Sequence, residues 1–477
     1  MTNGNKSTNS SPRKRLVLVG GGHAHAQVIR ALNKASRPDH LDVTLVDVQE
    51  SASYSGMVPG CIAGTYTPED TLLHLKPLAK WAGIDFCHDR VIDIDFDRNL
   101  IHLHNQHDPI PFDCVSLDIG SKSRGLDECP GAKKYTIPTR PIADLVHRLN
   151  QESELLIEKP HDVHAVVIGG GVAGIELSMN VMARFQKSVG ANNRVYVTVL
   201  DSGSEFMPSE TSLNRQALWK SLKERGIEVK FDASVEQVKE HSVVLSTGAE
   251  VPFTHCIWAT GAGSHDLAWR LQKRGVSVSE HGWIKVDKNL HSISQDRLFA
   301  AGDCCTIEGL PNGSPPKAGV YAVRSGPVLI ENLVRYLEEK PLKEYTPQDD
   351  FLKLMVRGDG TAIGFRFGIP IAGKWVMKLK DTIDKSFMDL FREENLPELK
   401  PGEPYDTSQY DAVKDERPPK KNPSDGAFLL QRTDDDVNYE EAWNVIRDMA
   451  DDKKYEAAVV EHINNAAPEL AMEMEYA

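Results

Sequence analysis

The stretch RLVLVGGGHAH, at residues 15–25, decides the fold class of this 477-residue chain. Leu16 to Val19 form a continuous apolar run, which is typical of a strand buried on both faces. Three glycines follow, and a helical pattern then continues to about Leu32. A strand, a glycine turn and a helix open a dinucleotide-binding βαβ unit, in which the backbone comes close to a pyrophosphate at the helix N-terminus. One position departs from the motif, because His25 stands where G-x-G-x-x-G has its third glycine.

The next apolar run, residues 43–46, predicts a second strand, and it ends in Asp47. Asp47 lies 25 positions after Gly22, where a ribose-binding carboxylate belongs in this type of unit. The alternative is a solvated aspartate at a strand end. We expect Asp47 to bind an adenosine ribose.

The opening motif recurs in complete form at residues 165–176, which read AVVIGGGVAGIE. Gly169, Gly171 and Gly174 supply all three glycines between a predicted buried strand and a predicted helix. The following strand, residues 195–200, ends in Asp201, and no arginine follows directly. A carboxylate there bonds the ribose and repels a 2′-phosphate, so NADH is favoured over NADPH. Two such units in one chain predict two bound dinucleotides.

Three later segments complete the pattern. Residues 258–261 (WATG) close the second unit with a glycine turn. Residues 298–303 (LFAAGD) indicate a buried strand that ends in Asp303. The Asp303 carboxylate can accept a hydrogen bond from a ribitol hydroxyl of FAD. Pro315 and Pro316 predict a helix with proline in its first turn. Its N-terminus and Lys317 would stabilise an anionic reduced flavin, although Lys317 could instead be solvated.

Composition narrows the classes of function. The net charge is −14, and residues 401–477 hold 19 acidic and 8 basic residues, which gives −11 there and −3 elsewhere. No basic stripe indicates nucleic-acid binding. No apolar window has the length of a membrane span, and the first fourteen residues lack a secretory signal. We therefore expect a cytoplasmic protein, with organellar or peripheral membrane association left open.

Seven cysteines without a C-x-x-C pair indicate a reducing compartment and no zinc site. Cys61 is expected to be buried and structural, with a reactive thiol as the alternative. The adjacent Cys304 and Cys305 are expected to be packed thiols, because a vicinal disulfide is strained. Three histidines at 102, 104 and 107 favour a solvated strand edge, so we predict no metal site.

The motifs in this order resemble the pyridine nucleotide-disulfide oxidoreductase superfamily of flavoproteins. The missing C-x-x-x-x-C redox motif and the absence of a C-terminal His-Pro dipeptide make the chain more similar to type II NADH dehydrogenases and sulfide:quinone oxidoreductases. It is most similar to the flavoprotein module fused ahead of selenide, water dikinase, through GGGHAHAQVI, YSGMVPGCIAGTY, DIGS, KAGVYAVRSGPVL and GKWVMKLKDTIDKSFM. That branch carries GGGHAH, so His25 is a mark of the branch. No kinase domain follows, so a selenium role is not implied.

The resemblance implies an α/β fold with two Rossmann-like dinucleotide-binding domains, one for FAD and one for NAD. A small C-terminal α+β domain and a charged tail would complete the chain. The expected boundaries are 13–125 and 280–340 for the two FAD segments, 126–279 for the NAD(H) domain, 345–395 for the C-terminal domain and 397–477 for the acidic linker and tail.

Within the expected C-terminal domain, apolar residues repeat at helical spacing among lysines, namely Trp375, Leu379, Ile383, Phe387 and Phe391. This pattern fits a membrane-surface helix that brings the flavin to a quinone, or a helix that packs in the core or a homodimer. Residues 397–426 contain six prolines and indicate a linker, and two short helical patterns follow at 439–449 and 455–463.

The resemblance implies an FAD-dependent NADH dehydrogenase that passes electrons to a second acceptor, a quinone. Lys317 is the predicted catalytic residue. The predicted FAD-binding residues are Gly20, Gly22, His23, Ala24, Asp47, Val91, Gly120, Gly302, Asp303, Lys317 and Ala318. The predicted NADH-binding residues are Gly169, Gly171, Gly174, Glu176, Asp201 and Gly261. Two alternatives stay open: a sulfide or thiol oxidoreductase that uses Cys61 with Cys129 or Cys304, and a flavin-bound adaptor with little turnover.

Overall fold

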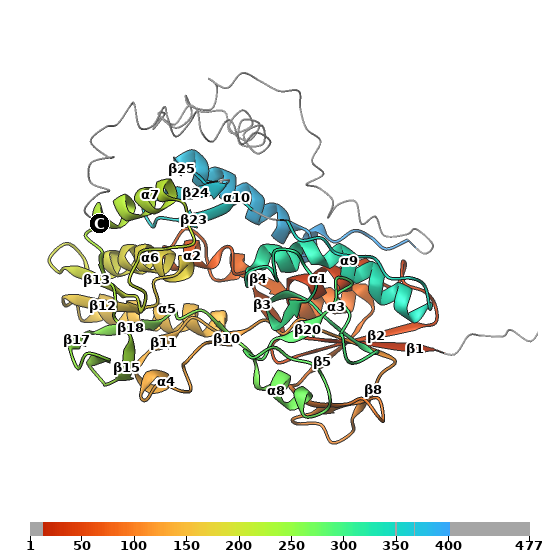
Figure 1. The fold of residues 1–477 in the computed structure, drawn as a ribbon. Helices are drawn as coiled ribbons and strands as arrows, with labels where there is room; N and C mark the ends of the chain where they lie inside the picture. Colours follow the sequence, from red (N-terminus) through yellow and green to blue (C-terminus); the bar gives the residue numbers. More distant parts are fainter. Residues whose placement is uncertain (1–12, 349–350, 367, 401–477) are drawn as a thin grey trace, which may run out of the picture.

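The computed structural model describes residues 13–348, 351–366 and 368–400, and two five-stranded parallel sheets organise them (Figure 1). The first sheet has the order β21-β9-β1-β2-β5. Its strands are β1 (Lys14–Val19), β2 (Leu41–Asp47), β5 (Asp85–His88), β9 (Cys114–Leu117) and β21 (Leu298–Ala300). The second sheet has the order β11-β18-β12-β13-β14. Its strands are β11 (Ile137–Pro138), β12 (Val163–Ile168), β13 (Val195–Leu200), β14 (Glu228–Lys230) and β18 (His255–Trp258).

Each sheet carries its glycine turn after a central strand. β1 leads into α1 (His23–Ala31), and β12 leads into α6 (Val172–Val189). Leu16 and Leu18 of β1 are fully buried, because helices cover both faces of a parallel sheet. This confirms the two predicted Rossmann-like units.

Segments far apart in sequence build the first unit together. β21 pairs with β9, and α9 (Gly319–Leu337) packs along α1. The amide of Gln27 on α1 donates to the carbonyl oxygen of Val323 on α9 at 2.9 Å. The chain leaves and re-enters this unit through β10 (Lys122–Ser123) and β19 (Ala262–Gly263), which pair antiparallel. The predicted domain boundaries near these crossings stay predictions.

Smaller sheets and helices surround the two units. β6 (Val91–Asp95) and β7 (Leu100–Leu103) form an antiparallel hairpin, with β8 (Ile110–Pro111) beside it. α8 (Asp266–Gln272) packs on β6. The other elements are β3 (Ser51–Ser53), α2 (Val58–Ile62), β4 (Leu72–His74), α3 (Leu75–Ala82), α4 (Ala132–Tyr135), α5 (Ile142–Glu158), α7 (Ser212–Lys223), β15 (Val235–Val238), β16 (Ser242–Leu245), β17 (Glu250–Pro252), β20 (Ile284–Val286) and β22 (Cys305–Ile307).

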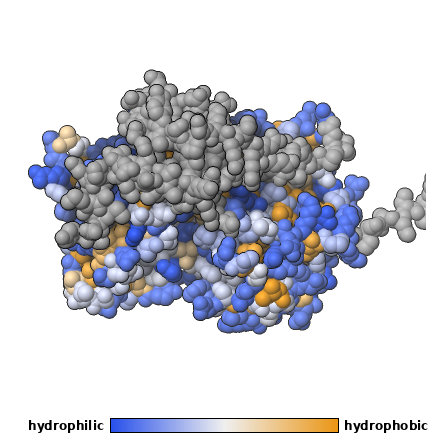
Figure 2. Space-filling model, turned by 45° about the horizontal axis from the view of Figure 1, so that its top comes forward, coloured by the Kyte–Doolittle hydropathy of each residue, from blue (hydrophilic) through white to orange (hydrophobic). Residues whose placement is uncertain are grey.

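The predicted C-terminal α+β unit consists of β23 (Lys353–Val356), β24 (Ala362–Arg366), β25 (Ile369–Gly373) and α10 (Lys374–Asp389). The apolar residues of α10 mostly face the core: Trp375 and Leu379 are buried, whereas Ile383 is 41% exposed. Of the two interpretations of this helix, the structure supports packing. On the face drawn in Figure 2, hydrophobic residues form separate patches among hydrophilic ones.

Within the described ranges, no helix is long and apolar enough to cross a membrane. The acidic tail from residue 401, nearly all of the predicted linker and both predicted tail helices lie outside the described residues. Membrane contact and a homodimer therefore stay predictions.

The predicted helix start at Pro315 is wrong. α9 begins at Gly319, with Ala318 as its N-cap, so the two prolines and Lys317 precede the helix. Proline disfavours a helical conformation in the residue before it, so Ser314 and Pro315 stay outside the helix. The hydroxyl of Ser314 accepts a hydrogen bond from the backbone N–H of Ile307 at 3.1 Å and fixes the start of the segment on β22.

Candidate active site

The glycine turn between β1 and α1 is tight and enclosed. Gly20 has φ +86°, and a Cβ there would lie 2.5 Å from the carbonyl oxygen of Asp118. The N–H of Gly21 donates to the Asp47 carboxylate at 2.6 Å, and the N–H of Gly22 donates to the Asp118 carbonyl at 3.1 Å. Gly22 is the N-cap of α1, so His23 and Ala24 open the helix. The turn thus holds the N-terminus of α1 at the carboxyl edge of the sheet, as a pyrophosphate site requires.

The carboxyl group of Asp118 occupies this helix N-terminus. It accepts hydrogen bonds from the backbone N–H groups of Ala24 at 2.9 Å and His25 at 3.1 Å. The residue is 3% exposed, and a Cβ on Gly22 or Gly302 would lie within 2.5 Å of its carboxyl group. Desolvation by burial raises the pKa of Asp118 to about 7.

The buried side chain of His25 contacts both the glycine turn and β9. Its Nδ1 is 2.6 Å from the carbonyl oxygen of Gly20, and its Nε2 is 2.8 Å from the hydroxyl oxygen of Ser116. Desolvation lowers the pKa of His25 to about 4, so the ring is neutral. Because a carbonyl oxygen only accepts, Nδ1 donates to Gly20 and Nε2 accepts from Ser116. The residue that replaces the third glycine therefore ties the turn to β9.

The other residues predicted to bind FAD lie along the same sheet edge. Asp47 ends β2 and accepts from the N–H of Gln49 at 2.7 Å, and its pKa is raised by desolvation. Val91, the first residue of β6, comes two residues after Asp89, and the N–H of Asp89 donates to the Asp47 carbonyl at 3.0 Å. Gly120 has φ +64° and open space where a Cβ would be.

Asp303 and Lys317 have protein partners in this structure. The Asp303 carboxylate accepts from the hydroxyl of Ser121 at 2.8 Å and from the guanidinium of Arg140 at 3.4 Å. The ammonium of Lys317 donates to the carbonyl of Cys305 and lies 4.5 Å from the ring centre of Trp283. The predicted roles of Asp303 and Lys317 stay predictions.

The second glycine turn has the same geometry but is open to solvent. Gly169 has φ +120°, and a Cβ there would lie 2.3 Å from the carbonyl oxygen of Ala259. A Cβ on Gly174 would lie 1.9 Å from the Gly169 carbonyl oxygen, whereas nothing lies within 4 Å of one on Gly171. Gly171 is exposed, and Val172, the first residue of α6, is 37% exposed. The exposed turn suits a cosubstrate that exchanges, and the enclosed turn at α1 suits a resident cofactor.

Asp201 and Gly261 flank the open turn. The Asp201 carboxylate accepts from the N–H of Gly203 at 3.0 Å, and a Cβ on Gly170 would lie 2.2 Å from it. Gly261 has φ +96°, next to Thr260, whose carbonyl accepts from Arg124 at 2.9 Å. These positions match those of Asp47 and Gly120 in the first unit.

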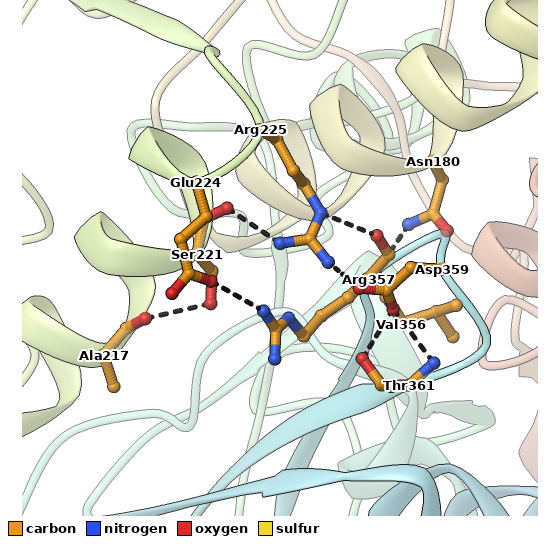
Figure 3. Close-up of polar contacts among 9 residues, drawn as sticks. All are labelled: Asn180, Ala217, Ser221, Glu224, Arg225, Val356, Arg357, Asp359 and Thr361. Atoms are coloured by element: carbon orange, nitrogen blue, oxygen red, sulfur yellow. Dashed lines mark hydrogen bonds and ion pairs between the residues drawn. The ribbon is translucent and has the colours of Figure 1, made fainter.

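Glu176 contacts the C-terminal unit rather than the open turn. Its carboxylate accepts from the backbone N–H of Val356 at 2.7 Å. One turn later on α6, the amide of Asn180 donates to the Val356 carbonyl at 2.8 Å (Figure 3). Desolvation raises the pKa of Glu176 to about 7, and Lys380 opposes that shift. Whether Glu176 also contacts NADH stays a prediction.

Ion pairs of the two residues that directly follow α7 continue this junction (Figure 3). Arg225 pairs with Asp359 and donates to the Arg357 carbonyl at 3.1 Å, and Arg357 pairs with Glu224 at 3.3 Å. A Cβ on Gly358 would lie 2.7 Å from that of Ala183, so the β23–β24 turn fits closely against α6. The C-terminal unit is thereby fixed to the second sheet unit.

α10 also reaches the first unit. The buried ammonium of Lys380 donates to the Gly56 carbonyl at 2.7 Å and to the Asp384 carboxylate at 2.9 Å. The hydroxyl of Tyr54 donates to Asp384 at 3.3 Å, and burial raises the pKa of Tyr54 well above its usual value. The ring of Tyr54 stacks on Phe387 at 5.0 Å. All three units therefore meet around Tyr54, Lys380 and Glu176.

His23 joins the aromatic rings at this meeting point. Its ring centre lies 5.2 Å from that of Tyr54 and 6.0 Å from that of Phe387. Desolvation lowers the pKa of His23 to about 4. A Cβ on Gly319 would lie 3.3 Å from His23, so the start of α9 borders the same place.

Several residues of this site were not among the predicted ones. Asp118 stands in the quoted DIGS motif, and Lys380 and Asp384 have the i, i+4 spacing of an ion pair on one helix, so both signals were present. Nothing in the sequence indicates Arg140, because its partner Asp303 is 163 residues away.

Comparisons with known proteins agree with this geometry. The model of the pyridine nucleotide-disulphide oxidoreductase family matches residues 14–326. A type II NADH:quinone oxidoreductase of Staphylococcus aureus is 23% identical over 391 aligned positions, and the match covers 78% of this chain and 94% of that protein.

Solved structures share the fold. The sulfide:quinone oxidoreductase of Aquifex aeolicus matches with a TM-score of 0.67 and 18% identity, over 80% of this chain and 92% of that one. NDH2 of Plasmodium falciparum, in complex with NADH, matches with a TM-score of 0.66 and 14% identity, over 81% of this chain and 99% of that one.

Added Cβ atoms would collide in both glycine turns, so both let the backbone approach a nucleotide closely; the enclosed turn at α1 fits FAD, and the exposed turn at α6 fits NADH. The chain belongs to the pyridine nucleotide-disulphide oxidoreductase family, and FAD and NADH are its cofactors.

Proposed function

We propose that this protein oxidises NADH through FAD and passes the electrons to a quinone. The observation that carries the proposal is the pairing of an enclosed glycine turn at α1 with an exposed one at α6, next to one meeting place of all three units. FAD supplies the hydride-accepting chemistry when bound. The protein supplies binding, orientation and electrostatics. The α6 N-terminus and Asp201 bind NADH, and the α1 turn with Asp47 binds FAD.

The meeting place of the units supports a flat, apolar acceptor. The rings of His23, Tyr54 and Phe387 lie within 6.0 Å of one another there. Aromatic faces favour stacking with another flat ring. Two relatives with the same fold have a quinone in their names, which supports a quinone as the acceptor.

Anaerobic spectroscopy of the purified holoprotein tests the proposal. NADH is expected to bleach the flavin absorbance, and a soluble quinone added afterwards is expected to restore it. NADPH under the same conditions is expected to bleach it far more slowly. A flavin that stays oxidised in excess NADH would contradict the proposal and favour the adaptor hypothesis. A flavin that is bleached but reoxidised only by disulfides or sulfur compounds would contradict the quinone.

Asp201→Asn is expected to weaken NADH use. A hydrogen bond to a charged group contributes about 1.5–3 kcal/mol, so the KM for NADH should rise about tenfold to a hundredfold, with a smaller change for NADPH. Steady-state kinetics with both nucleotides measure this. Asp162→Asn is the matched control, because that exposed carboxylate also accepts a backbone N–H, from Arg194 at 2.8 Å. Equal losses for both nucleotides in the Asp201 variant would contradict ribose recognition.

Cys61→Ser is expected to retain most activity. Cys61 is buried and free, and desolvation raises the pKa of its thiol, which disfavours the thiolate that thiol chemistry needs. Cys129 and Cys304 are also free, and their thiol pKa values are raised by desolvation. The measurement is kcat with NADH and a quinone. A hundredfold loss in the Cys61 variant, with full FAD content, would favour the thiol alternative.

A further inference from the structure

The N-terminus of α1 already holds a negative group of the protein. The Asp118 carboxyl group accepts the N–H groups of Ala24 and His25, and these belong to the donors that a helix N-terminus offers to a pyrophosphate. Asp118 is 3% exposed and is enclosed by the backbone at Gly22 and Gly302. A dianionic pyrophosphate bound at this turn therefore lies next to the Asp118 carboxyl group.

The surroundings do not neutralise this acid. Asp303 from the 3₁₀ turn after β21 and Asp47 from β2 both disfavour its ionised form. His23 and His25 on α1 are neutral, because desolvation lowers the pKa of each to about 4. Cys304 and Cys305 also interact electrostatically with Asp118. The nearby cations act on its neighbours: the Lys317 ammonium donates to the Cys305 carbonyl, Arg140 pairs with Asp303 at 3.4 Å, and His88 interacts with Asp47.

We propose that Asp118 takes up a proton when FAD binds, so that FAD is held more weakly as the pH rises above neutrality. In the holoprotein, the neutral carboxyl group lies next to the pyrophosphate without charge repulsion. Without FAD, the ionised carboxylate takes the place of a phosphate on the α1 donors. Asp118 is thus a positioning residue that couples FAD retention to pH, independently of the electron acceptor.

The second glycine turn provides an internal comparison. Asp118 follows β9 and donates its N–H to Val19 at 2.9 Å, and Ala259 follows β18 and donates its N–H to Ile168 at 2.8 Å. Gly20 and Gly169 approach these two residues in the same way. The open unit thus has alanine where the enclosed unit has an acid, so this fold does not need a carboxylate at the position.

The expected pH dependence has a definite sign. Desolvation raises the pKa of Asp118 to about 7 without FAD, and a bound pyrophosphate would raise it further. Below pH 6 Asp118 is protonated both with and without FAD, so the affinity for FAD does not change with pH. Above pH 7 binding requires proton uptake, and the dissociation constant should rise about 30-fold between pH 6 and pH 8.5.

The test is the equilibrium release of FAD from the full-length holoprotein across this pH range, read from free FAD fluorescence. The FAD dissociation constant of wild type should rise about 30-fold across this range, whereas those of Asp118→Asn and Asp118→Ala should stay constant within about threefold. Asp113→Asn is the matched control, because Asp113 precedes β9 and accepts the Arg15 N–H at 2.8 Å, at the far end of the strand. The control should keep the wild-type slope.

A second measurement does not depend on the variants. Calorimetric titration of FAD into the full-length apoprotein at pH 8, in buffers of different ionisation enthalpy, counts the protons taken up. About one proton per FAD is expected for wild type and about none for the Asp118 variants. A flat wild-type pH profile, no proton uptake, or an unchanged slope in Asp118→Asn would each overturn the proposal. If neither variant binds FAD, the number of protons that wild type takes up per FAD tests the proposal by itself. None of these results depends on NADH or quinone turnover.

Discussion

Lys380→Met is expected to lower the free energy of unfolding by about 3–5 kcal/mol, because it leaves the Asp384 carboxylate buried without its cation. The two side chains are each 6% exposed and lie 2.9 Å apart. The same substitution removes the hydrogen bond from Lys380 to the Gly56 carbonyl, through which α10 holds the segment after β3. Urea unfolding of the FAD-loaded protein, followed by circular dichroism and flavin fluorescence, measures the effect.

The same helix offers a matched control. Lys385 and Asp381 form an ion pair with the same i, i+4 spacing and the same 2.9 Å separation, but their side chains are 50% and 32% exposed. Because exposed pairs contribute little, Lys385→Met should cost about 0.5 kcal/mol or less. The double variant Lys380→Met/Asp384→Leu should recover most of the loss, since it removes the buried charge as well. Equal effects of the two lysine substitutions would contradict a structural role for the buried pair.

The parts of the fold predicted from sequence depend on local patterns. Continuous apolar runs such as residues 16–19 and 165–168 mark strands buried on both faces, and a glycine-rich turn after each identifies a dinucleotide unit. The C-terminal α+β unit was implied by the resemblance to known flavoproteins, whereas the two parallel sheets follow such patterns. The start of α9 did not, because the rule that places proline in a first helical turn competed with the restraint that proline imposes on the preceding residue.

The parts of the site that could not be predicted depend on contacts between distant segments. Asp118 reaches Ala24 across 94 residues, and Lys380 reaches Gly56 across 324. Sequence reasoning assigned Glu176 to NADH from its place in the glycine motif, and could not see that its carboxylate bonds to Val356, 180 residues later. The motif specifies which residues follow the turn, whereas the packing of the C-terminal unit decides which side chains are already engaged.

Gly174→Ala is expected to reduce NADH use about a hundredfold, by distorting the open turn. A Cβ there would lie 1.9 Å from the Gly169 carbonyl oxygen, so β12 and α6 must move apart. Overpacking of this kind costs about 1–3 kcal/mol in stability as well. FAD content should stay normal, because the first unit is untouched. Thermal unfolding, flavin absorbance and the rate of flavin bleaching by NADH measure the three effects.

Gly171→Ala in the same turn tests whether slower NADH use comes from a clash within the protein or from a clash with the nucleotide. Nothing lies within 4 Å of a Cβ at Gly171, so its stability should fall by about 1 kcal/mol or less. That empty space is where the backbone must admit a pyrophosphate at the N-terminus of α6, so NADH bleaching should still slow about tenfold or more. If Gly171→Ala leaves NADH bleaching unchanged, the nucleotide does not approach through this turn. The assignment of NADH to the exposed turn would then be wrong, whatever the result for Gly174.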